Sequence, residues 1–158
     1  MTTRAWANGE HMNETESATR DAEPSAAMRR LDRLVGTWTV TGGATGTVRF
    51  EWLTGGFFLL QHVDLVQGGH HVRALDVIGH ERPFGAEPGV DVRSRTYTNT
   101  GDTLDYVYEL EGDVLTIWGG EKGSPAYFRG SFSDGDTTIA GRWVWPGGGY
   151  TATMTRAK

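Results

Sequence analysis

The sequence contains no cysteine, which excludes disulfides, thiolate metal sites and a cysteine nucleophile. No apolar run approaches the ~20 residues that a membrane-spanning helix requires, and the first residues lack the apolar core of a signal peptide. The 15 basic residues against 20 acidic ones give a net charge of −5, and duplex-binding proteins normally present a basic face. We therefore expect a cytoplasmic protein that binds neither nucleic acid nor membrane.

The length of 158 residues favours one domain. Residues 1–23 are polar, mixed in charge and without periodicity, so we predict a disordered tail there and a single domain over residues 24–158. The 23 glycines fall between short apolar or aromatic segments, which is typical of a chain with many reversals.

The segment "EPSAAMRRLDRLVG" predicts one short helix. Pro24 and Ser25 suit its start, and Gly36 suits its end. Four apolar residues recur at helical spacing and would form one buried stripe: Met28, Leu31, Leu34 and Val35.

After Gly36 the pattern is that of strand after strand, many with apolar and polar residues in alternation. The predicted strands are Thr37–Thr41, Thr45–Leu53, Phe57–Val66, His71–Ile78, Val92–Thr98, Leu104–Leu110, Val114–Trp118, Ala126–Phe132, Thr137–Trp145 and Tyr150–Thr155. Short Gly- and Asp-containing links make sequential strands antiparallel neighbours. A meander of this size tends to close, so we predict an all-β antiparallel up-and-down barrel of about ten strands with the helix over one end.

The step Gly36-Thr37-Trp38, placed after a helix and at the start of a meander, resembles the Gly-x-Trp motif of the calycin group. That group includes lipocalins, fatty-acid-binding proteins and nitrobindin-like barrels. In those barrels a basic residue late in the last strand often lies across the tryptophan, and the resemblance assigns that place to Arg156. It implies a cation–π contact and a hydrogen bond that close one end of the barrel.

More closely, the chain resembles a family of small bacterial lipocalin-like proteins over about residues 28–156. The matching stretches are "LVGTWTV", "FEWLTGGFFLLQ", "LDVIGHE", "FSDGDTTIAGRW" and "YTATMTR". The resemblance implies a fold and no particular activity, because one fold serves many functions. Nitrobindin-like barrels hold haem through a histidine late in the chain, whereas no histidine follows His80 here. We expect no cofactor.

His62 and Asp64 share one face of a predicted strand with Phe58 and Leu60. If that face looks inward, His62 is a candidate base or ligand contact, because imidazole titrates near neutral pH. If it looks outward, the pair is merely solvated. The opposite face competes for the interior and is more apolar: Phe57, Leu59, Gln61, Val63 and Leu65.

Two neighbouring strands carry a second candidate group. Arg93, Arg95 and Tyr97 share one face, while Tyr106 and Tyr108 share a face of the next strand. An arginine among tyrosines suits a carboxylate or an enolate, and the alternative is an outward charged face with the tyrosines in the core.

Histidines and tryptophans complete the candidates. His70, His71 and His80 are chemically suited to zinc, but no spacing fixes their geometry and we expect no metal site. Tryptophans are mostly core residues, and a subset would give an aromatic pocket: Trp52, Trp118, Trp143 and Trp145.

Three functional hypotheses remain open. The first is binding of a small, largely apolar or aromatic molecule in the barrel. The second is a cofactor-independent isomerase or cyclase in the lumen, with His62, Arg95, Tyr106 or Tyr108 polarising an enol or carbonyl. The third is a packed barrel that serves as an interaction or dimerisation module, and a homodimer stays open in every case. The predicted ligand contacts are Trp52, Phe58, His62, Arg95, Tyr97, Tyr106, Tyr108, Trp118 and Trp143.

Overall fold

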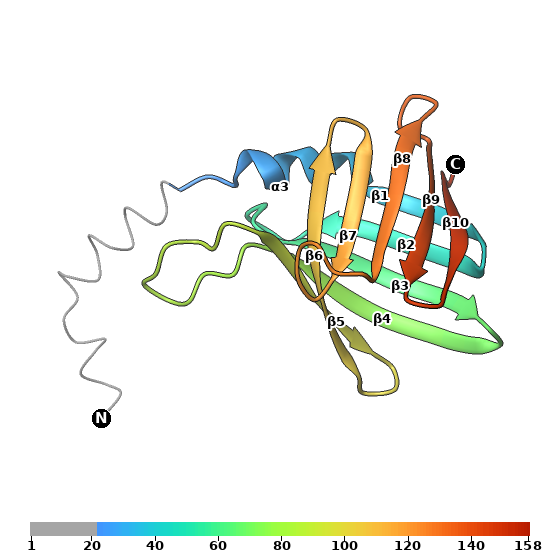
Figure 1. Ribbon diagram of the computed structural model, residues 1–158. Helices are drawn as coiled ribbons and strands as arrows, with labels where there is room; N and C mark the ends of the chain where they lie inside the picture. The colour runs from blue at the N-terminus through green and yellow to red at the C-terminus, as the bar shows by residue number, and fades with distance from the viewer. Residues whose placement is uncertain (1–21) are drawn as a thin grey trace.

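The computed structural model describes residues 22–158 as a closed barrel of ten antiparallel strands (Figure 1). Each strand pairs with its neighbours in sequence, and β1 closes the barrel by pairing with β10. The strands are β1 (Gly36–Gly42), β2 (Ala44–Trp52), β3 (Leu59–Gln67), β4 (His70–Gly79), β5 (Val92–Thr98), β6 (Thr103–Glu111), β7 (Val114–Gly119), β8 (Tyr127–Ser133), β9 (Thr138–Trp145) and β10 (Gly148–Arg156). The predicted fold class is confirmed. The tail predicted for residues 1–23 lies outside the described residues, except for residues 22 and 23.

All ten predicted strands are present, and no boundary differs by more than two residues. The tight links explain this agreement. Between β3 and β4 the two-residue turn is Gly68-Gly69, with φ of 54° and 79°. Positive φ at both central positions is what the hairpin turn requires, and glycine adopts it without a steric penalty.

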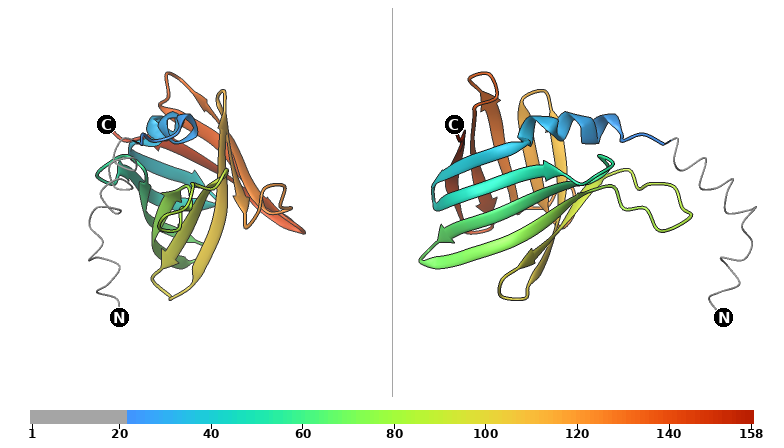
Figure 2. Two further views of the ribbon diagram at one scale, coloured as in Figure 1. Left: turned by 90° about the vertical axis from the view of Figure 1, so that its left-hand side faces the viewer. Right: turned by 180° about the vertical axis from the view of Figure 1, so that it is seen from behind.

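The N-terminal helix consists of α3 (Ala26–Arg30) and a 3₁₀ turn, η1 (Leu31–Leu34). The Ser25 hydroxyl caps α3 by accepting a hydrogen bond from the Met28 amide at 3.1 Å. Helix and turn lie across one end of the barrel, as two further views show (Figure 2). Three residues of the predicted stripe are at most 1% exposed and lie in the barrel core: Met28, Leu31 and Leu34.

Hairpin connections alternate between the two ends of the barrel. The links 53–58, 80–91, 112–113 and 134–137 lie at the same end as the helix, which we call the closed end. Residue 43 and the links 68–69, 99–102, 120–126 and 146–147 lie at the other end, which we call the open end. The helix is bonded to the closed-end links. Arg33 donates to Asp113 at 2.8 Å and to Asp136 at 2.9 Å, and Trp52 at the end of β2 donates to Asp32 at 2.8 Å.

The closed end is locked by Trp38 and Arg156. Trp38 is fully buried and donates its indole N–H to the Leu34 carbonyl at 2.8 Å. The Arg156 guanidinium lies 4.2 Å from the centre of the Trp38 ring and donates to the carbonyls of Val35 and Arg33. This is the contact that the calycin resemblance implied.

Gly36 allows the guanidinium to reach this position. Its φ is 124°, and a Cβ there would lie 2.7 Å from Nη1 of Arg156. The helical segment ends at Leu34 with Val35 as its C-cap, so Gly36 begins β1 and leaves room for the arginine.

None of the helices in residues 22–158 is long and apolar enough to cross a membrane.

Candidate ligand cavity inside the barrel

The barrel encloses a cavity of about 650 Å³ that is walled by inward-facing residues of the strands and opens at the open end. Its position follows from the alternation of the strands, because every second side chain points into the lumen. The deep wall near the helix is formed by Leu34, Phe50, Asp76, Tyr108, Leu115 and Phe128. The mouth is formed by Gln67, His70, His71, Asn99, Thr100, Asp102, Trp145 and Tyr150.

The wall of this cavity is mainly apolar and aromatic. Trp143 on β9 contacts Tyr106 edge to face, with ring centres 6.0 Å apart, and Phe128 with ring centres 5.5 Å apart. Nearer the mouth, Trp145 contacts Tyr150 at 5.8 Å. These rings give the lumen flat aromatic surfaces on several sides.

One acidic side chain, Asp76 on β4, lies in the deep wall of the cavity and is only 2% exposed. The Thr96 hydroxyl donates to Oδ1 at 2.9 Å, and the Tyr108 hydroxyl donates to Oδ2 at 2.9 Å. Ser94 also faces this carboxyl, but its buried hydroxyl has no hydrogen bond of ordinary geometry within the described residues.

The environment of Asp76 changes the protonation of the deep wall. Removal from water raises the pKa of the Asp76 carboxyl, and the bonds from Thr96 and Tyr108 only partly oppose this. Burial and the nearby Asp76 carboxylate raise the pKa of Tyr106 to about 12, and the same causes raise that of Tyr108 well above its usual range. The two tyrosines are therefore neutral hydrogen-bond donors at physiological pH.

The polarity of the lumen is asymmetric in charge. Asp76 lies in the deep wall and Asp102 at the mouth, whereas within residues 22–158 no lysine or arginine lines the cavity. His70 and His71 lie at the mouth. The polar groups inside the described barrel are therefore acidic groups and hydroxyls, without a fixed positive charge.

Three of the predicted ligand contacts line this cavity: Tyr106, Tyr108 and Trp143. Tyr106 and Tyr108 lie on the strand face that the sequence predicted them to share, and Trp143 lies on the same face of β9 as Trp145. Because their faces are the apolar ones, they point inward.

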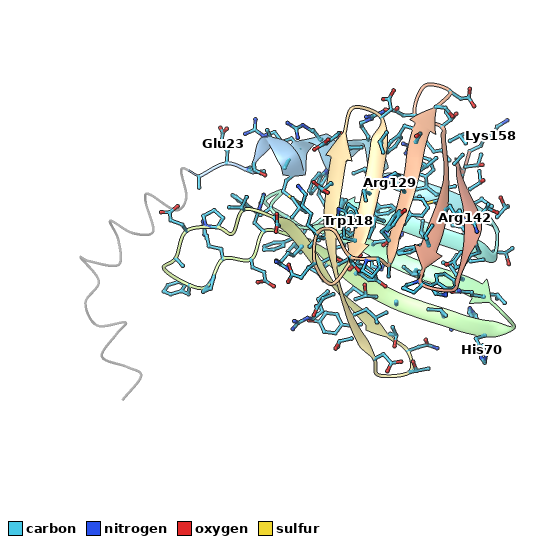
Figure 3. All side chains as sticks on the ribbon, in the orientation of Figure 1. Glu23, His70, Trp118, Arg129, Arg142 and Lys158 are labelled. Atoms are coloured by element: carbon cyan, nitrogen blue, oxygen red, sulfur yellow. The ribbon has the colours of Figure 1, made fainter. Side chains whose placement is uncertain are left out.

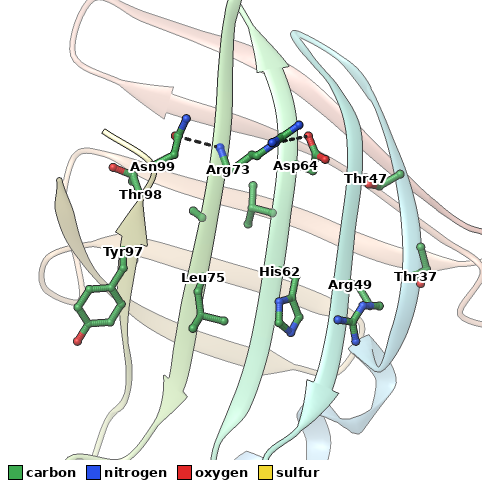
Figure 4. A pocket seen from close by; sticks show the side chains of 12 residues that line it. Thr37, Thr47, Arg49, His62, Asp64, Arg73, Leu75, Tyr97, Thr98 and Asn99 are labelled. Atoms are coloured by element: carbon green, nitrogen blue, oxygen red, sulfur yellow. Dashed lines mark hydrogen bonds and ion pairs between the residues drawn. The ribbon is translucent and has the colours of Figure 1, made fainter. Parts of the chain in front are cut away.

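His62 does not line the lumen, which corrects the inward interpretation of its face. Its partner face on β3, with Leu59 and Val63, points inward because it is the more apolar of the two. His62 lies on the outer face of the barrel, beside Arg49 and across the sheet from Tyr97 (Figure 4). Its imidazole contacts Glu51 at 2.6 Å, and hydrogen bonds from Arg49 and then His62 lower the pKa of that carboxyl.

Arg95 and Tyr97 also lie outside the lumen. Arg95 donates to Asp105 on the neighbouring strand at 2.8 Å, and Tyr97 is 50% exposed. Burial of Ser94 and Thr96 on the opposite face of β5 turns these larger polar groups outward. Arg95 is therefore not placed to polarise a substrate inside the barrel together with Tyr106 or Tyr108.

The remaining predicted contacts, Trp52, Phe58 and Trp118, do not line the cavity either. Trp52 packs at the closed end, and Phe58 lies against the backbone of Gly79, where a Cβ would approach it to 2.5 Å. Trp118 lies on the outer face of β7 beside Arg129 (Figure 3) and donates its indole N–H to Glu109.

The histidines considered for zinc do not converge. His70 begins β4 at the open end, whereas His80 follows β4 at the closed end. There, Nε2 of His80 lies 2.8 Å from the Ser25 hydroxyl and Nδ1 lies 3.0 Å from the Asp91 carbonyl, which fixes the start of α3 against the link 80–91. Within residues 22–158, no group of three acidic or histidine side chains is placed to hold a metal ion.

The sequence reasoning missed Asp76. A signal for it exists in "ALDVIG", because Asp76 shares a strand face with Ala74 and Ile78. An acidic residue on an otherwise apolar face is either a strand-edge residue or a buried polar site. The pairing partner Thr96 was equally hidden, since threonine is common in strands.

No family model matches the sequence, and a search of the curated proteins finds no relative.

Proposed function

We propose that this protein binds a small, largely apolar or aromatic molecule inside the barrel. The observation that carries the proposal is the cavity of about 650 Å³ with aromatic walls. Ligand sites are typically concave, mainly apolar and roughly 300–1,000 Å³ in volume, with a few polar groups that orient the ligand. Here Asp76, Tyr108 and Thr96 supply those polar groups.

The alternative of a cofactor-independent enzyme keeps a narrower basis. Tyr106 and Tyr108 point into the lumen, and a carboxyl and a tyrosine hydroxyl in one apolar site can polarise a carbonyl. His62 and Arg95 lie outside, so an enzyme here would rely on Asp76 and the tyrosines alone. The open lumen argues against the third hypothesis, a packed barrel without a ligand.

The Trp38–Arg156 contact and the closed ten-stranded meander support assignment to a lipocalin-like family of the calycin type. We include this assignment in the proposal. The cytoplasmic location remains a prediction from the sequence.

Replacement of two alanines by phenylalanine, one inside the barrel and one outside, tests the proposal. Ala74 on β4 lines the lumen, whereas Ala140 on β9 is exposed on the outer face. Ala74→Phe should fill part of the cavity and abolish binding, and Ala140→Phe should leave it intact. The measurements are native mass spectrometry of protein purified from its own source and fluorescence titration with the uncharged probe N-phenyl-1-naphthylamine.

If the proposal is right, both measurements should lose binding when the lumen is filled and keep it when the outer face is changed. Binding that survives Ala74→Phe, or a wild-type protein that retains no molecule and takes up no uncharged apolar probe, would refute it. Far-ultraviolet circular dichroism of each variant checks that the barrel still forms.

A further inference from the structure

We infer that the lumen selects organic cations: molecules with an apolar or aromatic body and a protonated amine that pairs with the Asp76 carboxylate. This inference rests on the proposed function, because it specifies the chemistry of the molecule that the cavity takes.

The first step is the isolation of Asp76. Its two carboxyl oxygens accept hydrogen bonds from Thr96 and Tyr108, both of which are neutral donors. Asp76 forms no ion pair within the described chain. The acidic residues that do form ion pairs there lie nearer the surface and pair with an arginine, a lysine or a histidine. A buried carboxylate without a cationic partner is unfavourable, and a bound ammonium group would supply that partner.

The second step is the sign of the charge along the whole cavity. Asp102 lies at the mouth and Asp76 in the deep wall, and the described part of the chain places no lysine or arginine between them. A ligand carboxylate or phosphate would meet like charge at both places, and no fixed positive charge lines the described cavity. An amine would meet favourable charge along its path.

The third step is the aromatic wall. Trp143 contacts both Tyr106 and Phe128, and Tyr108 adds a fourth ring next to the carboxyl. Ring faces attract cations, and the attraction grows where water is excluded. Carboxylate and rings together form the kind of site that recognises a substituted ammonium group.

A proton must move when such a ligand binds. Burial raises the pKa of Asp76, so wherever the carboxyl holds its proton, that proton leaves to solvent as the ammonium group enters, and the carboxylate then accepts a hydrogen bond from the ligand N–H. Amine affinity should therefore rise with pH through the titration of Asp76, whereas the affinity of an uncharged ligand should not.

Most of the other side chains around Asp76 are uncharged. Gln61 on β3, Ser94 and Thr96 on β5, and Tyr106 and Tyr108 on β6 face the neighbourhood of Asp76 and stay uncharged below pH 9. His70, His71 and Asp102 at the mouth and Tyr150 on β10 are the remaining titratable groups that line the cavity. Asp76→Asn keeps every one of these groups, so it separates their effect on binding from that of Asp76.

The experiment compares two ligands of the same shape. The affinities of 2-(1-naphthyl)ethylamine and 2-(1-naphthyl)ethanol are measured by isothermal titration calorimetry from pH 5 to pH 8. At pH 7.5 the wild-type protein should bind the amine at least about tenfold more tightly than the alcohol, the size expected of one charge-assisted hydrogen bond. Asp76→Asn, which keeps the shape of the side chain, should remove this preference and still bind the alcohol.

Asp105→Asn is the matched control, because Asp105 lies on the outer face and pairs with Arg95. It should leave the preference unchanged. The pH dependence that persists in Asp76→Asn comes from the other titratable groups that line the cavity. The difference from wild type is then the contribution of Asp76.

The outcomes separate the two proposals. If the wild-type protein binds the alcohol as tightly as the amine, and Ala74→Phe no longer binds the alcohol, the proposed ligand binding stands and the selection of cations is refuted. An amine preference that survives Asp76→Asn also refutes the inference. If neither compound binds while Ala74→Phe and wild type behave alike, the proposed function itself is refuted.

Discussion

Replacement of Trp38 by alanine tests the architecture most directly. Its side chain is 0% exposed, and it contacts Phe132 edge to face with ring centres 6.3 Å apart. The substitution also removes the hydrogen bond to the Leu34 carbonyl and the surface on which Arg156 rests. Truncating a buried large aromatic residue costs about 3–5 kcal/mol. The lost indole bond and cation–π contact place Trp38→Ala toward the upper half of that range, at about 4 kcal/mol.

Urea unfolding followed by far-ultraviolet circular dichroism is the suitable assay, because tryptophan fluorescence changes with the substitution itself. With a denaturant slope of about 2 kcal/mol/M, the unfolding midpoint should fall by about 2 M. Trp145→Ala is the control. Trp145 is 40% exposed at the mouth, so its loss should cost only about 1 kcal/mol.

The reasoning fails if the two tryptophans behave alike. A loss below about 1 kcal/mol for Trp38→Ala would mean that the closed end does not hold the barrel together. Where Trp38→Ala does not fold, Trp38→Phe supplies the comparison, since it keeps an aromatic ring and loses only the indole bond and part of the packing.

Four further predictions concern the closed end and the deep wall. Gly36→Ala should lower the free energy of unfolding by about 1–3 kcal/mol, because φ of 124° is strained for alanine and its Cβ displaces Arg156, and the same urea titration checks it. Arg156→Lys should destabilise by about 1–3 kcal/mol, since an ammonium group cannot donate to the same carbonyls in fork geometry, and a loss equal to that of Arg156→Ala would show that the fork is what matters. Burial raises the pKa of Asp76 in the folded chain, so its contribution to stability is complete below the ordinary aspartate pKa and is lost as pH rises through the raised pKa. The melting temperature of the wild-type protein should therefore fall more steeply above pH 4 than that of Asp76→Asn. Asp76→Ala should be less stable than Asp76→Asn by about 1–3 kcal/mol, because it leaves the hydroxyls of Thr96 and Tyr108 without an acceptor, and equal stabilities would contradict this account of the site.

The barrel could be predicted because its signals are local. Alternation assigns each strand two faces, and glycine turns such as Gly68-Gly69 fix sequential antiparallel neighbours. The Trp38–Arg156 contact joins the first and last strands, yet a motif at each end of the chain was enough to indicate it.

The direction of each strand face was harder to predict than its existence. On β3 both faces are partly apolar, and one register step exchanges the lumen for solvent. His62 was therefore ambiguous from the sequence, whereas Trp143, on a strand with one clearly aromatic face, was not. Arg95 shows the same limit: the small residues Ser94 and Thr96 occupy the interior beside it, and small polar residues give a weak signal of burial.

The closed end of the barrel carries most of the packing that stabilises the fold, whereas the proposed binding site lies in the lumen. A lumen that is left open gives up packing contacts which the same strands would otherwise make. The contacts that remain are concentrated at the closed end, where Met28, Leu31 and Leu34 fill the core under the helix and Arg156 joins the first and last strands. Substitutions at the closed end should therefore lower the free energy of unfolding, whereas substitutions that leave the Thr96 and Tyr108 hydroxyls with an acceptor, such as Asp76→Asn, should change it less. The acidic residue Asp76 in the deep wall, where an apolar one would pack better, fits the proposed role of that wall in binding an ammonium group.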